Sequence, residues 1–107
     1  MTRLTYNKVK DYRLEQLAAQ GGCCHLCGEA IVDDAVLDHC HKTGLVRRVL
    51  HRGCNALLGK IENNMPRNRI TVDRLNAIAL NLTTYITATH TDITHPTHKE
   101  KVGKKKK

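Results

Sequence analysis

The hydrophobic pattern of the chain predicts three helices. An imperfect apolar stripe over residues 7–20 ends at two consecutive glycines, which is typical of a helix with glycine after its last turn. A shorter stripe covers residues 54–62, and the segment 63–66 (Asn-Asn-Met-Pro) predicts a break after it. The most regular stripe runs over residues 71–87, with Thr71 as the expected N-cap. We expect this last helix to pack in the core, with a dimer interface as the alternative.

Two short apolar segments between the first two helices predict a β-hairpin. Residues 35–39 and 45–50 have strand character, and a turn at residues 41–44 separates them. The order helix, strand, strand, helix, helix predicts the α+β fold class. We expect the hairpin and the helix after it to be flanked by an N-terminal and a C-terminal helix.

The composition predicts a small core. The chain has 107 residues, with three Tyr but no Phe and no Trp, so the core must be built from Leu, Ile, Val and Ala. Small domains bury a low fraction of their surface and often need metals or disulfides. We expect one domain over residues 1–90 and a basic, disordered tail over residues 91–107.

The net charge of +8 is shared between the tail and the body. Residues 91–107 hold six Lys and two acidic residues, which gives +4 and leaves +4 on the rest of the chain. Positive charge in both parts suits a polyanionic partner such as nucleic acid. The alternative is a solvated surface with an unstructured tail, and charge alone does not separate the two.

The cysteines favour metal binding over disulfides. There are five of them, an odd number, and the polar, basic N-terminus does not resemble a signal peptide. No apolar stretch approaches the roughly 18 residues that a transmembrane helix needs. We therefore expect a cytoplasmic, reducing location, where disulfides are rare.

Two ligand pairs of equal spacing predict a structural zinc site. Two residues separate the members of each pair, so both side chains can reach one ion from a single turn. The four predicted ligands are Cys24, Cys27, His51 and Cys54. Cys23 competes with Cys24 but lacks the tight-turn spacing. The alternatives are buried free thiols, or a His51 that is an ordinary surface histidine.

A second set of residues between and beside these pairs has the character of a catalytic site. The Asp38 carboxylate and the Asn55 carbonyl oxygen are hard ligands, suited to Mg²⁺ rather than zinc. His39 follows Asp38 directly and could take a proton from water. Asn55 follows a zinc ligand, so the zinc would fix it relative to the hairpin. The alternative for Asp38 and His39 alone is a turn or helix cap.

With these residues in place, the chain resembles the phage recombination endonuclease VII-like HNH nucleases. The similar segments are residues 19–28, 37–47 and 54–59, and the resemblance extends over roughly residues 6–86. It implies a ββα-metal (His-Me finger) hairpin and helix, a structural zinc, and Mg²⁺- or Mn²⁺-dependent cleavage of DNA phosphodiesters. It also implies a phage gene, and so the host cytoplasm as location.

The resemblance also implies residue roles. Asp38 and Asn55 would bind the catalytic ion, and His39 would be the general base that activates water. His41 matches a family histidine near the scissile phosphate and would contact the phosphate or the leaving side.

The chain departs from the family pattern at two positions. His51 stands where the family usually has Cys, and Arg48 stands where it commonly has Gly after an Arg. Imidazole is an accepted zinc ligand, so we expect the site to survive. Arg47, Arg48 and Lys42 are the candidate DNA contacts, although Arg48 could equally be solvated.

These predictions describe a small zinc-stabilised endonuclease that nicks or cuts double-stranded DNA with weak sequence specificity, as a monomer or homodimer. One alternative is a structure-selective Holliday-junction resolvase, by family analogy, which would favour a dimer. The other is a non-catalytic zinc-knuckle protein that binds nucleic acid. That protein would need the cysteine pairs but would have no use for Asp38, His39 and Asn55 together.

Overall fold

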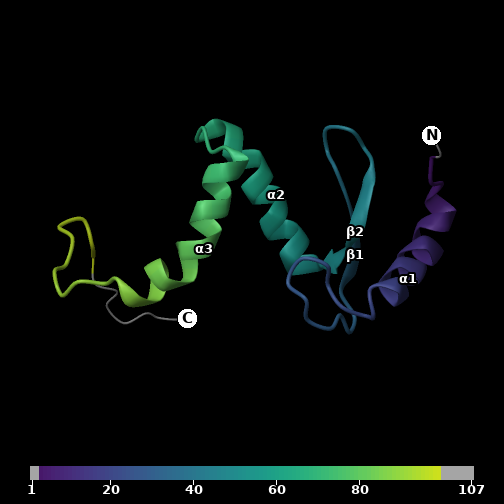
Figure 1. The fold of residues 1–107 in the computed structure, drawn as a ribbon, viewed down its shortest axis with the longest axis horizontal. Coiled ribbons are helices and arrows are strands. Elements are labelled where there is room, and N and C mark those ends of the chain that lie inside the picture. The colour runs from purple at the N-terminus through teal and green to yellow at the C-terminus, as the bar shows by residue number, and fades with distance from the viewer. Residues whose placement is uncertain (1–2, 100–107) are drawn as a thin grey trace. The chain divides into compact units, whose positions relative to one another are not determined.

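A computed structural model of the chain describes residues 3–99 and confirms the α+β class. The described residues fall into two compact units, divided between Ile70 and Thr71. The first unit contains the β1–β2 hairpin, which continues directly into helix α2 (Figure 1). In chain order the elements are a 3₁₀ turn, η1 (Tyr6–Lys8), then α1 (Val9–Ala19), β1 (Ala35–His39), β2 (Val46–His51), α2 (Arg52–Arg67) and α3 (Val72–Ala88).

The hairpin contains a bulge at the residues of most chemical interest. Its strands are antiparallel, with Leu37 opposite Val49 and His39 opposite Val46. Between these two pairs, Asp38 alone faces two residues of β2, which are Arg47 and Arg48. A bulge of this kind bends the strand and changes the direction of the side chains beside it. The predicted first strand is confirmed residue for residue, and the second begins one residue later than predicted.

The core of the first unit is as small as the composition predicts. Four apolar side chains are buried: Cys24, Ile31, Val49 and Leu50. One of them is a predicted zinc ligand, and another predicted ligand, Cys54, packs against the group. The metal cluster and the core are therefore continuous.

Gln20 fastens the end of α1 to the hairpin. Its Nε2 donates to the carbonyl oxygens of Val49 (2.9 Å) and Cys23 (2.8 Å), and its Oε1 accepts from the Val49 N–H at 2.9 Å. The side chain thus satisfies both backbone groups of Val49, a residue with 0% exposure. A buried backbone group without a partner is costly, so this contact places α1 firmly beside β2.

Helix α2 is longer than predicted, and the expected break at residues 63–66 is wrong. Pro66 lies in the last turn, where its missing N–H costs a single helical hydrogen bond. The side-chain amides of Asn64 and Asn68 donate to carbonyls four residues earlier, at 2.8 and 3.0 Å, and so support this end of the helix. The helix ends where Arg69 takes a positive φ of 56°.

Helix α3 belongs to the second unit. Its predicted N-cap is confirmed, because the Thr71 Oγ1 accepts a hydrogen bond from the Arg74 N–H at 3.2 Å. None of its residues is buried, so the expected burial of its apolar stripe is not found; within the stripe, Val72 is 73% exposed and Ile86 56%. The basic tail is described only to Lys99, without helix or strand, and residues 100–107 lie outside the described part.

Candidate metal centre and active site

The four predicted zinc ligands converge. The ligand atoms of Cys24, Cys27, His51 and Cys54 all lie within 4.8 Å of one another. A tetrahedral zinc ion with bonds of about 2.0–2.3 Å places its ligand atoms roughly 3.5–3.8 Å apart, so the group is close to the size of a zinc site. Two ligands come from the loop after α1, and two flank the junction of β2 with α2. This Cys/His cluster suggests structural zinc binding.

The loop that supplies the first two ligands is folded around their sulfur atoms. The Leu26 N–H donates to the Cys24 Sγ at 3.4 Å, and the Glu29 N–H donates to the Cys27 Sγ at 3.5 Å. Gly28 follows with a φ of +85°, a left-handed conformation that glycine adopts without strain. The backbone N–H groups therefore stabilise negative charge on the thiolates that a metal requires.

The His51 ring is oriented by a backbone carbonyl. Its Nε2 lies 2.9 Å from the carbonyl oxygen of Ala30, while its Nδ1 lies 3.3 Å from the Cys27 Sγ and 3.8 Å from the Cys54 Sγ. The carbonyl can only accept, so Nε2 carries a proton and Nδ1 is the nitrogen that faces the thiols. The Ala30 carbonyl, with help from the cysteines, raises the pKa of His51 to about 9.

The thiols of the cluster differ in acidity. Burial acts to raise the pKa of Cys24, but hydrogen bonds from the N–H groups of Cys27, His51 and Leu26 outweigh it and lower that pKa to about 6. Burial, followed by the neighbouring thiols, raises the pKa of Cys54 to about 11. Cys24 is therefore the first of these two cysteines to carry negative charge.

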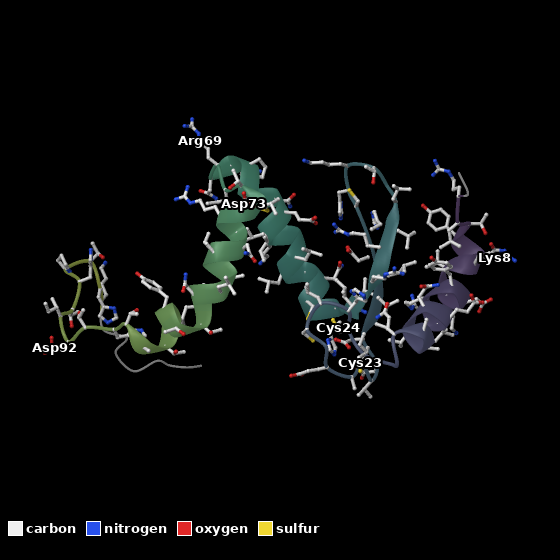
Figure 2. The ribbon with its side chains drawn as sticks, viewed as in Figure 1. Lys8, Cys23, Cys24, Arg69, Asp73 and Asp92 are labelled. Carbon is white, nitrogen blue, oxygen red and sulfur yellow. The ribbon has the colours of Figure 1, made fainter. Side chains whose placement is uncertain are left out.

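Cys23 lies outside the cluster, as its spacing predicts. Its Sγ donates to the carbonyl oxygen of Gly21 at 3.6 Å, whereas the adjacent Cys24 is buried. Figure 2 labels both cysteines, which lie in the segment between α1 and β1. All five cysteines are free thiols. Cys23 is therefore directly adjacent to a candidate zinc ligand but takes no part in the candidate zinc site.

The predicted catalytic residues lie on the hairpin and at the start of α2. Asp38 is buried in the bulge, while His39 and His41 are exposed on the hairpin and stack with ring centroids 4.8 Å apart and an interplanar angle of 21°. Asn55 is partly buried in the first turn of α2, next to Cys54.

Sequence reasoning missed Glu62 and the position of Arg47. The Arg47 Nε donates to the Asp38 Oδ2 at 2.6 Å, and its Nη1 and Nη2 donate to the two Glu62 oxygens at 2.9 and 3.1 Å. These hydrogen bonds from Arg47 lower the pKa of Glu62. The same contacts, with Glu62 first, raise the pKa of Arg47. Glu62 lies two helical turns after Asn55, so helical periodicity could have placed it on the same face of α2.

The other candidate DNA contacts are exposed. Arg48 is exposed on β2, and Lys42 is exposed in the hairpin turn. Arg48 also lines a shallow pocket of about 530 Å³ between the end of α1 and the metal-binding loop, together with Gln16 and His25.

Comparison with known families identifies the chain. The family model for recombination endonuclease VII matches residues 1–86, which is most of the chain. The chain belongs to the recombination endonuclease VII family. Membership makes it a nuclease, a hydrolase that acts on DNA. No curated protein matches the chain closely enough to be reported as a relative. Among the helices of residues 3–99, none has the length and apolar character needed to cross a membrane.

Proposed function

We propose that this endonuclease VII family member is a metal-dependent DNA endonuclease of the HNH type, in which β1, β2 and α2 form the ββα-metal unit. The main support is the junction between β2 and α2. His51 ends β2, Cys54 lies in the first turn of α2, and Asn55 follows Cys54 directly. A structural zinc ion on these ligands would fix Asn55 relative to the strand that carries Asp38.

Asp38 and Asn55 would hold the catalytic cation. Their donor atoms are a carboxylate and an amide oxygen, which Mg²⁺ and Mn²⁺ accept. Among residues 3–99, Arg47 is the hydrogen-bond partner of the Asp38 carboxylate, through Oδ2, and Oδ1 has none. This oxygen is therefore available to a cation. The bound ion would supply positive charge to the phosphate as negative charge develops on it.

His39 would accept the proton of the attacking water. Its ring is exposed, so a DNA strand can approach it, and stacking on His41 restricts its rotation. A base held in this way can contribute about 10²–10⁴-fold to the rate. His41, on the same exposed surface, would contact the scissile phosphate or the leaving side.

Binding to DNA would be mostly electrostatic. The chain carries a net charge of +8, and Arg48 and Lys42 are exposed near the proposed active site. Contacts of this kind go to phosphates and carry little sequence information. We therefore propose weak sequence specificity.

A plasmid assay tests this function. Supercoiled plasmid is incubated with the zinc-loaded protein in Mg²⁺, in Mn²⁺ or in EDTA, for the wild type and His39→Ala. Nicking should require a divalent ion and fall by about 10²-fold or more in His39→Ala. The proposal is wrong if no divalent ion supports cleavage, and the base assignment is wrong if His39→Ala cuts at the wild-type rate.

Junction resolution is the second candidate, because the matching family is described as a recombination endonuclease. Resolution needs two active sites, and the exposed apolar stripe of α3, which includes Leu82 and Ile86, would offer a surface for a second copy of the chain. A four-way junction and a linear duplex with the sequence of one arm are compared at equal concentration. Preferential cleavage of the junction, together with a dimer by light scattering, would favour resolution over general nicking.

A further inference from the structure

Among the described residues, 3–99, the Asp38 carboxylate is held at one oxygen only. The Arg47 Nε donates to Oδ2 at 2.6 Å, and the Asp38 side chain is 7% exposed. A guanidinium that offered two nitrogens to Asp38 would occupy both carboxylate oxygens. Because Arg47 uses Nε here, Oδ1 stays free for another ligand.

Glu62 determines this geometry from the other side of the guanidinium. The two terminal nitrogens of Arg47 donate to the two Glu62 oxygens at 2.9 and 3.1 Å, which is a bidentate pair. Such a pair fixes both the plane and the direction of the guanidinium. With that plane fixed, the Nε–H points at Asp38, so Glu62 orients Asp38 through Arg47.

The charges of Asp38, Arg47 and Glu62 together favour a bound cation. Two carboxylates and one guanidinium give a net charge of −1, whereas Asp38 and Arg47 alone would give zero. A divalent cation at Asp38 would feel the full repulsion of Arg47 if Glu62 did not offset it. Glu62 comes from α2 and Asp38 from β1, so the folded unit brings this counter-charge to the strand.

We propose that Glu62 is a positioning residue that acts through Arg47 to present the Asp38 Oδ1 to the catalytic cation and to offset the charge of Arg47. This inference rests on the proposed function for the assignment of Asp38 as a ligand of that cation. A merely structural ion pair between β2 and α2 would contribute only modestly to the free energy of unfolding, because its side chains are 34% and 38% exposed. Its loss would leave the affinity for the cation unchanged.

Mn²⁺ binding to the zinc-loaded full chain separates these possibilities, with free Mn²⁺ measured by electron paramagnetic resonance. The Mn²⁺ binding that is lost in Asp38→Asn is the binding that depends on the Asp38 carboxylate. Glu62→Gln should weaken that binding by about tenfold, as expected for residues that orient metal ligands. Glu15→Gln is the matched control, because it removes the same charge from an exposed position of α1 and should bind as the wild type does.

A double variant tests whether Glu62 acts through Arg47. In an Arg47→Met background, Glu62→Gln should cause no further loss of affinity, because the group that transmits its effect is absent. Zinc content and thermal unfolding are measured for every variant to show that each is folded.

The outcomes distinguish this inference from the proposed function. If the wild type cuts DNA and Glu62→Gln binds Mn²⁺ as tightly as the wild type, the inference is wrong and the function stands. If Asp38-dependent Mn²⁺ binding weakens in Glu62→Gln but the wild type does not cut DNA, the proposed function is wrong, and what stands is that Glu62 positions Asp38 for a cation that is not catalytic. Absence of any Asp38-dependent Mn²⁺ binding in the wild type overturns the inference.

Discussion

The carbonyl oxygen of Ala30 accepts a hydrogen bond from the Nε2 of His51 at 2.9 Å, and this contact determines which ring nitrogen faces the cysteine thiols. Nδ1 is the ring nitrogen nearer to the backbone. A ligand through Nδ1 therefore reaches little further than a cysteine sulfur would. This explains how a histidine can take the place of a cysteine in such a cluster without enlarging the site.

His51→Cys should accordingly keep the zinc site. We expect one zinc ion per chain by elemental analysis and a melting temperature near that of the wild type, because a thiolate is at least as good a zinc ligand as imidazole. His51→Ala should lose zinc, since three ligands leave the ion open. If His51→Ala instead binds zinc as tightly as the wild type, His51 is not a ligand.

Removal of a thiolate should unfold the first unit. Structural zinc contributes about 10–16 kcal/mol of apparent binding free energy in small zinc domains, and the core over the described residues of the first unit has four buried apolar side chains. Cys54→Ser should therefore lose zinc and most of its helical circular dichroism from α1 and α2. Cys23→Ser is the matched control and should keep both zinc and fold, because Cys23 lies outside the cluster. A zinc-free Cys54→Ser protein that remains fully folded would contradict this prediction.

The sequence was sufficient for the parts of the fold that depend on local spacing. The bounds of β1 and the Thr71 cap are as predicted, and the four predicted metal ligands converge. Each depends on residues close together along the chain or on the fixed reach of a ligand pair. The identity of the ions and the roles of Asp38 and Asn55 remain predictions.

The sequence-based predictions fail where contacts between residues distant along the chain determine the local structure. Helix α2 continues past the predicted break because Pro66 falls in its last turn, where the missing N–H costs a single hydrogen bond, whereas composition alone suggested a turn. The bulge that brings Arg47 to Asp38 depends on strand register, which local propensity does not specify. The apolar residues of α3 recur at helical spacing, but this spacing does not specify which surface packs against them.

The hydrogen bonds of Gln20 to Val49 predict that replacing Gln20 will lower the stability of the first unit. Gln20→Met has a similar shape but leaves the buried N–H and carbonyl of Val49 without their side-chain partners. The carbonyl keeps the His25 N–H as a donor at 3.1 Å, so the N–H is the group left unsatisfied. One buried unsatisfied group costs about 1–3 kcal/mol, and we expect a loss of that size in the free energy of unfolding. Denaturant titration of the zinc-loaded protein measures it. Gln16→Met, one turn earlier on α1, should change the free energy of unfolding by less than about 0.5 kcal/mol.

Arg47 and Arg48 are neighbours in β2, but we expect only Arg48 to contact DNA. The Arg47 guanidinium is engaged by Asp38 and Glu62, whereas Arg48 is exposed, so we expect Arg48 to be the one that contacts DNA phosphate. Arg48→Gly removes the side chain and its charge. It should weaken binding to duplexes of different sequence by a similar factor and reduce the slope of log K against log salt by about 0.9, the value for one lost phosphate contact.

Fluorescence anisotropy with labelled duplexes, in Ca²⁺ to prevent cleavage, measures both quantities. Lys10→Gln removes the same charge from an exposed position on α1 and should leave the slope nearly unchanged. If Arg48→Gly and Lys10→Gln weaken binding equally, Arg48 acts only through the overall charge of the protein. A direct phosphate contact instead requires the loss at Arg48 to be the larger one and to diminish as salt rises, because each released counterion contributes less free energy at higher salt.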